Sequence, residues 1–148
     1  MKNSVSSDLL AKKFILLARL MEVSRDNPFK IRTYRFASGI IGNKKRSLTN
    51  SDIKALSNIR GIGDAVVKKS IELLETGSIK KIEEIKEGIP PTILKLITET
   101  SIPSSIIAAI WKDYMIVTED EIIDFLTGRK EQLKLSQKQV LDAEKALK

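Results

Sequence analysis

Two glycines, Gly61 and Gly63, separate two stretches of helical spacing and limit how those stretches can be joined. Glycine adopts backbone angles that a side chain forbids, so a Gly-x-Gly turn lets one helix follow another at a sharp angle. Apolar residues recur at helical spacing on both sides of the turn: Leu56, Ile59, Val66, Val67, Ile71 and Leu74. The segment Ile59–Lys69 therefore predicts a hairpin of two helices.

The second helix of this hairpin is expected to begin near Asp64, a residue type that favours the N-cap position. The backbone N–H groups of Gly63, Asp64 and Ala65 would then point outward without partners inside the helix. These donors and the positive end of the helix dipole suit a phosphate oxygen, and Lys68 and Lys69 follow one turn later. The turn either binds phosphate or is a tight connection that binds nothing, and the flanking segments favour binding.

The charge of the chain is concentrated in the half that contains this turn. The 148 residues include 26 Lys and Arg and 19 Asp and Glu, a net charge of +7. Residues 1–80 hold 16 of these basic residues against 7 acidic ones, a net of +9, and residues 81–148 hold 10 against 12, a net of −2. A basic face on one part of a molecule is what phosphate binding requires, whereas a merely solubilising surface need not be so uneven.

Cysteine and histidine are both absent, which excludes whole classes of site. Disulfides, thiolate nucleophiles, imidazole bases and most zinc sites all need one of these residues. No apolar run reaches the length of a membrane span, and the N-terminal residues lack the apolar core of a signal peptide. We therefore expect an intracellular protein, in the cytoplasm or nucleoid, or in the nucleus of a eukaryote, with no membrane partner.

Helical spacing runs through the whole chain, and no alternating pattern of a strand is visible. The fold class is therefore predicted to be all-α. Helices are expected at 9–23 after a cap among Ser6, Ser7 and Asp8, 28–41, 51–58, 64–75, 79–87, 90–100, 104–116, 118–128 and 136–148, with Gly77, Ser104, Thr118 and Gly128 at helix ends. Gly88, Pro90 and Pro91 form the clearest boundary, which predicts two domains, 1–90 and 91–148.

The first two predicted helices each have an apolar and a cationic side. In the first, Leu9, Leu10, Phe14, Leu17, Leu20 and Met21 are expected to face the core, and Lys12, Lys13 and Arg19 to face solvent. In the second, the core stripe is Ile31, Tyr34, Ala37, Ser38 and Ile41, and cationic residues stand at Lys30, Arg32 and Arg35. Tyr34 is either a plain core residue with its hydroxyl at the rim or part of a site.

The loop after the second helix is polar and basic. It contains Lys44, Lys45 and Arg46, which either contact phosphate or form a solvated loop. Asn50 or Ser51 is expected to cap the short helix that leads into the hairpin.

With these segments identified, residues 7–90 resemble the N-terminal region of family X DNA polymerases, the repair polymerases of the beta type. NPFKIRTYRFASGII is similar to their NPFRIRAYRxAA helix, and IRGIGDAVVKKSIELLETGSIKKIEEI is similar to their first helix-hairpin-helix and its trailing ETGxIxxLEEL. The resemblance implies the same small all-α, DNA-binding domain. No counterpart of the catalytic palm domain is present, so polymerase activity is not expected.

The remainder is similar to the second hairpin region of that family, in a degenerate form. Ser101, Ile102 and Pro103 occupy the place of a Gly-x-Gly turn, so this hairpin is not expected to bind phosphate. It could instead be a packing surface or a surface for a protein partner, with Trp111 and Met115 as anchors.

The resemblance also implies a candidate lyase site for deoxyribose phosphate. Lys69 falls on the family's Schiff-base lysine, Lys30 on a phosphate-binding lysine and Tyr34 on a tyrosine of the same pocket. Neighbouring cations such as Lys68, Lys30 and Arg35 would favour the neutral amine that the reaction needs. Ala65 and Phe29 depart from the family, where a lysine and a histidine are common. Lys69 is therefore either the nucleophile or only a phosphate contact.

A monovalent cation is the one cofactor that the resemblance implies. In the family, backbone carbonyl groups of the hairpin hold a Na⁺ or K⁺ ion beside the phosphate, and the corresponding residues here are Ser57, Ile59 and Ile62.

Three functions are thus expected from the sequence. The first is sequence-independent binding of the DNA backbone at gaps or 5′-phosphate ends, through Gly61, Gly63, Asp64, Ala65, Lys68, Lys69, Lys30, Arg32 and Arg35. The second is a deoxyribose-phosphate or abasic-site lyase that uses Lys69. The third is a helical scaffold whose acidic C-terminal half recruits a repair or replication partner.

Overall fold

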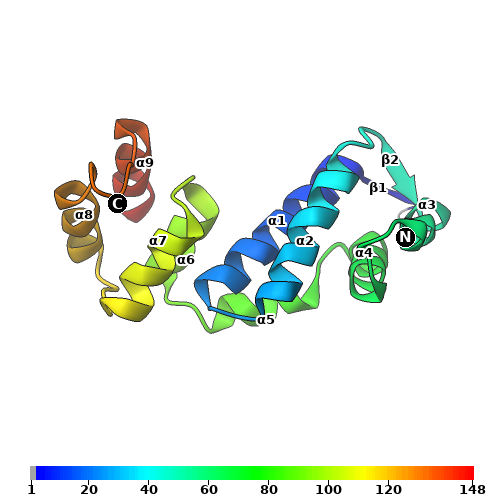
Figure 1. The fold of residues 1–148 in the computed structure, drawn as a ribbon, viewed down its shortest axis with the longest axis horizontal. Helices are drawn as coiled ribbons and strands as arrows, with labels where there is room; N and C mark the ends of the chain where they lie inside the picture. The colour runs from blue at the N-terminus through cyan, green and yellow to red at the C-terminus, as the bar shows by residue number, and fades with distance from the viewer. Residues whose placement is uncertain (1–2) are drawn as a thin grey trace. The chain divides into compact units, whose positions relative to one another are not determined.

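The computed structural model describes residues 3–148; residues 1 and 2, with which the first predicted domain begins, lie outside it. Helices make up most of the described chain (Figure 1), which confirms the all-α prediction. They are α1 (Ser7–Val23), α2 (Pro28–Gly42), α3 (Asn50–Ala55), α4 (Asp64–Thr76), α5 (Lys80–Glu87), α6 (Pro91–Glu99), α7 (Ser104–Ala108), α8 (Glu119–Gly128) and α9 (Gln137–Leu147), with a 3₁₀ turn η1 (Leu56–Asn58) and a π turn η2 (Ala109–Asp113).

The chain divides into two compact units, and α1 contributes to both. The first unit contains the residues up to Ala18 and Asn27–Glu84, and the second contains Arg19–Asp26 and Ile85–Lys148. The last part of α1 thus packs with residues that come more than sixty positions later. The assignment of domains to 1–90 and 91–148 stays a prediction.

The expectation that the chain has no strand is wrong at one place. β1 (Ser4–Ser6) pairs antiparallel with β2 (Ser47–Thr49), and Val5 lies opposite Leu48. Each strand has three residues and buries one side chain, so no alternating pattern can be recognised in the sequence. The pair fixes the start of α1, since the amide of Ser7 donates to the carbonyl oxygen of Arg46 at 3.0 Å.

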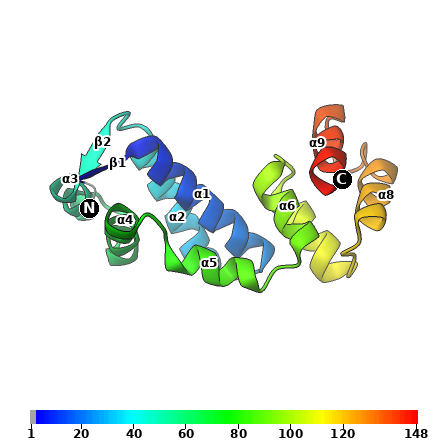
Figure 2. The same ribbon diagram turned by 180° about the vertical axis from the view of Figure 1, so that it is seen from behind.

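Helices α1 and α2 form the core of the first unit and lie side by side in Figures 1 and 2. The rings of Phe14 and Tyr34 stack with their centroids 5.7 Å apart. The hydroxyl of Ser38 donates to the carbonyl oxygen of Ala11 at 2.9 Å, which satisfies a polar group inside the core. The stripe predicted for α2 is confirmed, because its buried residues are Ile31, Tyr34, Ala37, Ser38 and Ile41.

Two of the residues predicted for the faces of α1 lie elsewhere. Leu9 is 43% exposed, although its neighbour Leu10 is fully buried. Arg19 does not face solvent: its guanidinium is partly buried and donates to backbone carbonyl groups of the second unit, such as that of Ile97. Helical spacing alone cannot identify such a residue, since a solvent-facing arginine has the same pattern.

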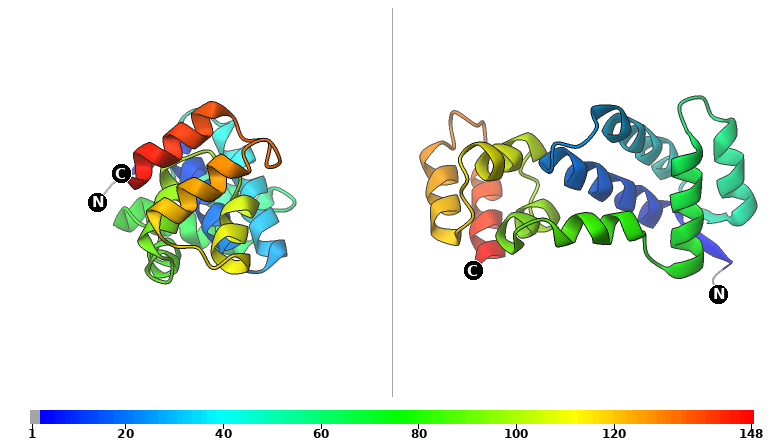
Figure 3. Two further views of the ribbon diagram at one scale, coloured as in Figure 1. Left: turned by 90° about the vertical axis from the view of Figure 1, so that its left-hand side faces the viewer. Right: turned by 90° about the horizontal axis from the view of Figure 1, so that it is seen from below.

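The helix before the hairpin begins at a cap that differs from the predicted one. Thr49, and not Asn50 or Ser51, is the N-cap of α3, and it forms a capping box with Asp52. The carboxylate of Asp52 accepts from the amide and hydroxyl of Thr49 and pairs with Arg46 at 3.0 Å. Of the three basic loop residues, Arg46 therefore supports the cap. Helices α3 and α4 lie side by side, as Figure 3 (right) shows.

The second unit is built from α6 packed on α9 and α9 packed on α8. The predicted cap at Thr118 is confirmed, whereas Pro103 rather than Ser104 caps α7, and Ser104 is a buried first residue. Ser136, predicted as the first residue of the last helix, is the N-cap of α9. The helix predicted for 104–116 ends early: α7 stops at Ala108, a π turn follows, and Met115 has φ of 55° and is 82% exposed. A partner surface in this half stays a prediction.

Within residues 3–148, no helix is both long enough and apolar enough to cross a membrane.

Replacing Asp52 with asparagine should lower the thermal midpoint at neutral pH, with an effect that disappears in acid. The amide of Thr49, then Arg46 and the Thr49 hydroxyl, hold the pKa of Asp52 below its ordinary value. A pKa lowered in the folded state adds stability above the ordinary value, and this stability is lost as the pH falls through the folded value. Unfolding curves from pH 7 to about pH 2 should therefore show the difference between wild type and Asp52→Asn closing below about pH 4.

The matched control is Asp142→Asn, which removes an i,i+4 pair with Lys138 on the surface of α9. It should change the midpoint little at any pH. A difference between wild type and Asp52→Asn that is as large at pH 2 as at pH 7 would contradict the assignment.

Candidate functional site

The turn between η1 and α4 is anchored by its one apolar side chain. Ile62 lies between the two glycines and is buried in the first unit. Gly61 has φ of 98°, a left-handed value that residues with a side chain rarely adopt, whereas Gly63 is extended with φ of −100° and ψ of −179°. The predicted turn is therefore formed, and the predicted cap is corrected by one residue: Gly63 is the N-cap, and Asp64 is the first residue of α4.

Three backbone amides at the start of α4 are available to a ligand. The carbonyl oxygen of Gly63 accepts from the amides of Val66 and Val67 at 3.2 and 3.4 Å, which starts the helix. Within residues 3–148 no acceptor binds the amides of Gly63, Asp64 and Ala65, and all three residues are exposed. Because α4 has 13 residues, the positive end of a full helix dipole lies behind these donors. The arrangement suits an anion with several oxygen atoms.

The two glycines serve different purposes in this turn. A Cβ atom on Gly61 would lie 2.9 Å from the ring of Phe36, so α2 packs directly against the bare backbone. A Cβ atom on Gly63 would meet no heavy atom within 4 Å. The first glycine is thus required by the fold, whereas within residues 3–148 nothing fills the space beside the second. Phe36, which is 45% exposed, was not identified from the sequence, because nothing local marks this contact.

Lys69 and Tyr34, which the sequence predicts for one pocket, lie together. The Nζ atom of Lys69 is 5.6 Å from the centroid of the Tyr34 ring, within the range of a cation–π contact. Tyr34 is only 5% exposed and stacks on Phe14, so its ring is part of the core. The same ring contacts Lys69. Lys30 stands one turn before Tyr34 on the same side of α2. Lys69 itself is half-buried.

The other predicted cationic residues lie on exposed positions around this group. The guanidinium of Arg32 lies 4.7 Å from the ring centroid of Phe29, which is 71% exposed. Arg35 is three residues further along the same helix and therefore on the same side as Arg32, away from Lys30. Lys68 is exposed beside Lys69. The cationic residues of α2 are thus divided between two faces, and Lys30 is on the face of Tyr34 and Lys69.

The three carbonyl groups predicted to hold a Na⁺ or K⁺ ion have lone pairs that accept no amide hydrogen from the described residues, and the ion itself stays a prediction. The carbonyl oxygen of Ile59 accepts from the amide of Ile62 at 3.1 Å and keeps one lone pair, and within residues 3–148 no amide donates to the carbonyl oxygens of Ser57 and Ile62. Backbone carbonyl oxygens are ligands of monovalent cations in proteins. No group of three or more acidic side chains that could hold a metal ion occurs in the same residues.

Replacing Gly61 with alanine should destabilise the first unit by about 1–3 kcal/mol, since alanine must either keep a strained φ or displace the Phe36 ring. Urea unfolding measures this free energy. Gly39→Ala is the control: Gly39 lies within α2, a Cβ atom there meets nothing within 4 Å, and the change should be neutral or stabilising. Equal stability of the two variants would contradict the role assigned to Gly61.

Comparisons with known proteins agree with this geometry. A family model described as a helix-hairpin-helix domain matches residues 6–79, half of the chain. The chain is also similar to the Bacillus subtilis (strain 168) protein DNA polymerase/3′-5′ exonuclease PolX, with 26% identity over 97 residues. The match covers 66% of this chain but only 17% of that relative. From the family match, the chain belongs to the helix-hairpin-helix domain family.

Proposed function

We propose that the chain binds the sugar-phosphate backbone of DNA without reading its sequence. The observation that carries this proposal is the exposed set of amides at Gly63, Asp64 and Ala65, with Lys68 and Lys69 one turn behind them. Amides and lysines at a helix start recognise phosphate oxygens, which are the same at every base pair. The net charge of +9 on residues 1–80 adds a long-range attraction.

Family membership and the similarity to a DNA polymerase support DNA binding in a repair or polymerase context. The chain spans 17% of the length of that relative, so the activities in the relative's name are not transferred to it.

The preferred DNA, in this proposal, is a gap or an end with a 5′-phosphate. A terminal phosphate carries more charge than an internal one and can be approached from more sides. Lys69, whose Nζ lies 5.6 Å from the Tyr34 ring centroid, and Lys30, on the same side of α2 as Tyr34, would add positive charge for a phosphate of this kind. A K⁺ or Na⁺ ion on the carbonyl groups of Ser57, Ile59 and Ile62 would add a further positive charge.

A second candidate function, removal of a 5′-deoxyribose phosphate, is favoured by the place of Lys69. Lys69 is half-buried, its Nζ lies 5.6 Å from the Tyr34 ring centroid, and Lys68 is its neighbour in the chain. In this reaction the neutral amine adds to the C1′ aldehyde of the opened sugar, and loss of water gives an iminium ion. Loss of a C2′ proton then breaks the C3′–O bond and releases the downstream strand with its 5′-phosphate. Hydrolysis of the remaining imine frees the lysine.

Two substitutions should weaken DNA binding in different ways. Lys68→Ala removes a phosphate contact and should reduce the slope of log K against log salt by about 1. Gly63→Ala leaves the charge unchanged and places a methyl group in front of the amides, so it should weaken binding with little change in slope. Fluorescence anisotropy with a gapped, 5′-phosphorylated duplex at several salt concentrations measures both effects.

The control is Lys145→Ala, which removes an exposed lysine of α9 in the second unit. It should leave both the affinity and the slope nearly unchanged. If Lys145→Ala weakens binding as much as Lys68→Ala, the affinity follows net charge alone and the proposed role of the turn in DNA binding is wrong.

Borohydride trapping on a gapped duplex with a 5′-deoxyribose phosphate distinguishes lyase activity from DNA binding alone. If Lys69 is the nucleophile, wild type forms a covalent adduct, and Lys69→Arg forms none although it keeps the charge and binds the duplex. Lys68→Ala should still be trapped once binding is saturated. No adduct with wild type at saturation would make Lys69 a phosphate contact only.

A further inference from the structure

The second unit contains a second helical hairpin that repeats the first at an offset of 40 residues. In the first, α4 begins at Asp64 and the carbonyl oxygen of Gly63 accepts from the amides of Val66 and Val67. In the second, α7 begins at Ser104 and the carbonyl oxygen of Pro103 accepts from the amides of Ile106 and Ile107 at 3.0 and 3.2 Å. The turn residues Ser101, Ile102 and Pro103 therefore correspond to Gly61, Ile62 and Gly63.

Arg19 lies against the carbonyl groups of this second turn. Its guanidinium makes hydrogen bonds to four backbone oxygens and one hydroxyl of the second unit. Nη2 donates to the carbonyl oxygens of Ile97 at 3.0 Å, Thr100 at 3.3 Å and Leu96 at 3.5 Å. Nη1 donates to the carbonyl oxygen of Ile102 at 3.0 Å and to the hydroxyl of Ser104 at 3.4 Å. Nε donates to the carbonyl oxygen of Ile97 at 3.2 Å. Such a set of oxygen atoms around one positive charge resembles the ligand shell of a cation.

The same offset relates these oxygens to the predicted ion ligands of the first hairpin. Subtracting 40 from Ile97 and Ile102 gives Ser57 and Ile62, two of the three residues whose carbonyl groups fit a Na⁺ or K⁺ ion. The oxygens also include the last carbonyl groups of α6, where a helix has free acceptors and the negative end of its dipole. A positive charge is therefore favoured at this place whatever its source.

We propose that the Arg19 guanidinium is the resident cation of the second hairpin and takes the place of a bound monovalent ion. The part of this proposal that compares the two hairpins rests on the proposed function, because it assumes an ion in the first. An arginine is always charged and presents its donors in a fixed fork, so the second turn keeps its charge at any concentration of Na⁺ or K⁺.

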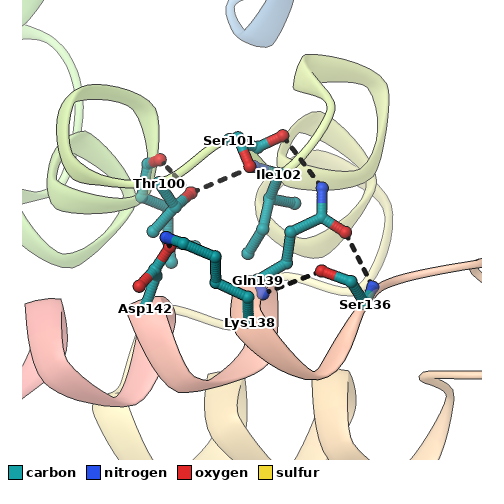
Figure 4. Close-up of polar contacts among 8 residues, drawn as sticks. Thr100, Ser101, Ile102, Ser136, Lys138, Gln139 and Asp142 are labelled. Carbon is teal, nitrogen blue, oxygen red and sulfur yellow. Dashed lines mark hydrogen bonds and ion pairs between the residues drawn. The ribbon is translucent and has the colours of Figure 1, made fainter.

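The second turn is also closed to phosphate, which fits a purely structural hairpin. Pro103 has no amide hydrogen where Gly63 has one, and Ser104 is buried. Figure 4 shows Gln139 of α9 reaching the turn: its Nε2 donates to the carbonyl oxygen of Ser101 at 3.2 Å, and its Oε1 accepts from the amide of Ser136. Arginine and glutamine thus satisfy the turn from within the protein.

The test is thermal unfolding of the full chain in KCl and in tetramethylammonium chloride at equal ionic strength. Trp111 is the single tryptophan and lies in the second unit, so its fluorescence reports that unit. The difference between the wild-type midpoints in the two salts is the baseline, because an ion at the first hairpin would contribute to it in every variant. Arg19→Ala should lower the midpoint by about 5–10 °C in tetramethylammonium, since the carbonyl groups lose their partner, and K⁺ should restore part of the loss because it can take the vacated place.

Arg25→Ala is the matched control, because Arg25 is also an arginine of the second unit and pairs with Asp113 through two hydrogen bonds of 2.8 and 2.6 Å. This pair is exposed, so its loss should lower the midpoint little and should not create a response to K⁺. An Arg19→Ala midpoint that gains no more from K⁺ than the wild-type midpoint does, or that equals the wild-type midpoint in tetramethylammonium, overturns the proposal.

Arg19→Lys keeps the test decisive if Arg19→Ala does not fold in either salt. Lysine retains the positive charge but cannot reach all the oxygens, so a lower midpoint without a response to K⁺ is expected. A lysine variant that K⁺ stabilises more than it stabilises wild type would overturn the proposal.

Binding of thallium(I), a K⁺ analogue, added as its nitrate, separates this proposal from the ion of the first hairpin. Wild type should bind one Tl⁺ and Arg19→Ala two. Zero in wild type and one in Arg19→Ala would support the role of Arg19 and refute the ion at Ser57, Ile59 and Ile62. Two in wild type would overturn the role of Arg19.

Discussion

Backbone groups that a helix leaves unpaired at its ends are the constraint on which this structure depends. A hairpin of two helices brings the free carbonyl groups of one helix and the free amides of the next to a single turn, and buried groups of this kind need partners. In the first hairpin, the amides at Gly63, Asp64 and Ala65 stay exposed and are open to a ligand. In the second, Arg19 and Gln139 satisfy the turn from within. The same motif is thus open to a ligand in the first hairpin and closed by side chains of the protein in the second.

Packing on one side of the first hairpin makes this difference possible. Ile62 is buried, Gly61 lies against the Phe36 ring, and Lys69 rests on Tyr34, so the turn is held from the core side only. Among the described residues, none lies within 4 Å of where a Cβ atom on Gly63 would stand. Rigid support on one side and open space on the other is the arrangement that a pre-organised phosphate site needs, because little entropy is lost when the ligand binds.

The local features of the fold were predictable from the sequence, and the contacts between distant residues were not. The core stripe of α2, the left-handed cap at Gly77 and the cap at Thr118 follow from spacing and residue type. The turn was predictable because two glycines between helical patterns carry a signal, and the closeness of Lys69 to Tyr34 was implied by the family resemblance. Phe36 on Gly61 and Arg19 in the second unit depend on tertiary packing. The two short strands are below the length at which alternation is visible.

The division of α1 between the two units has a consequence for how this protein can be cut or recombined. A fragment ending at Glu84 would carry Arg19–Asp26 without the residues that they pack against, and a fragment beginning at Ile85 would lack Arg19. No single break in the chain releases either unit whole. A gene fusion or an exchange of modules would therefore have to keep both units in one fragment, although each unit has its own core.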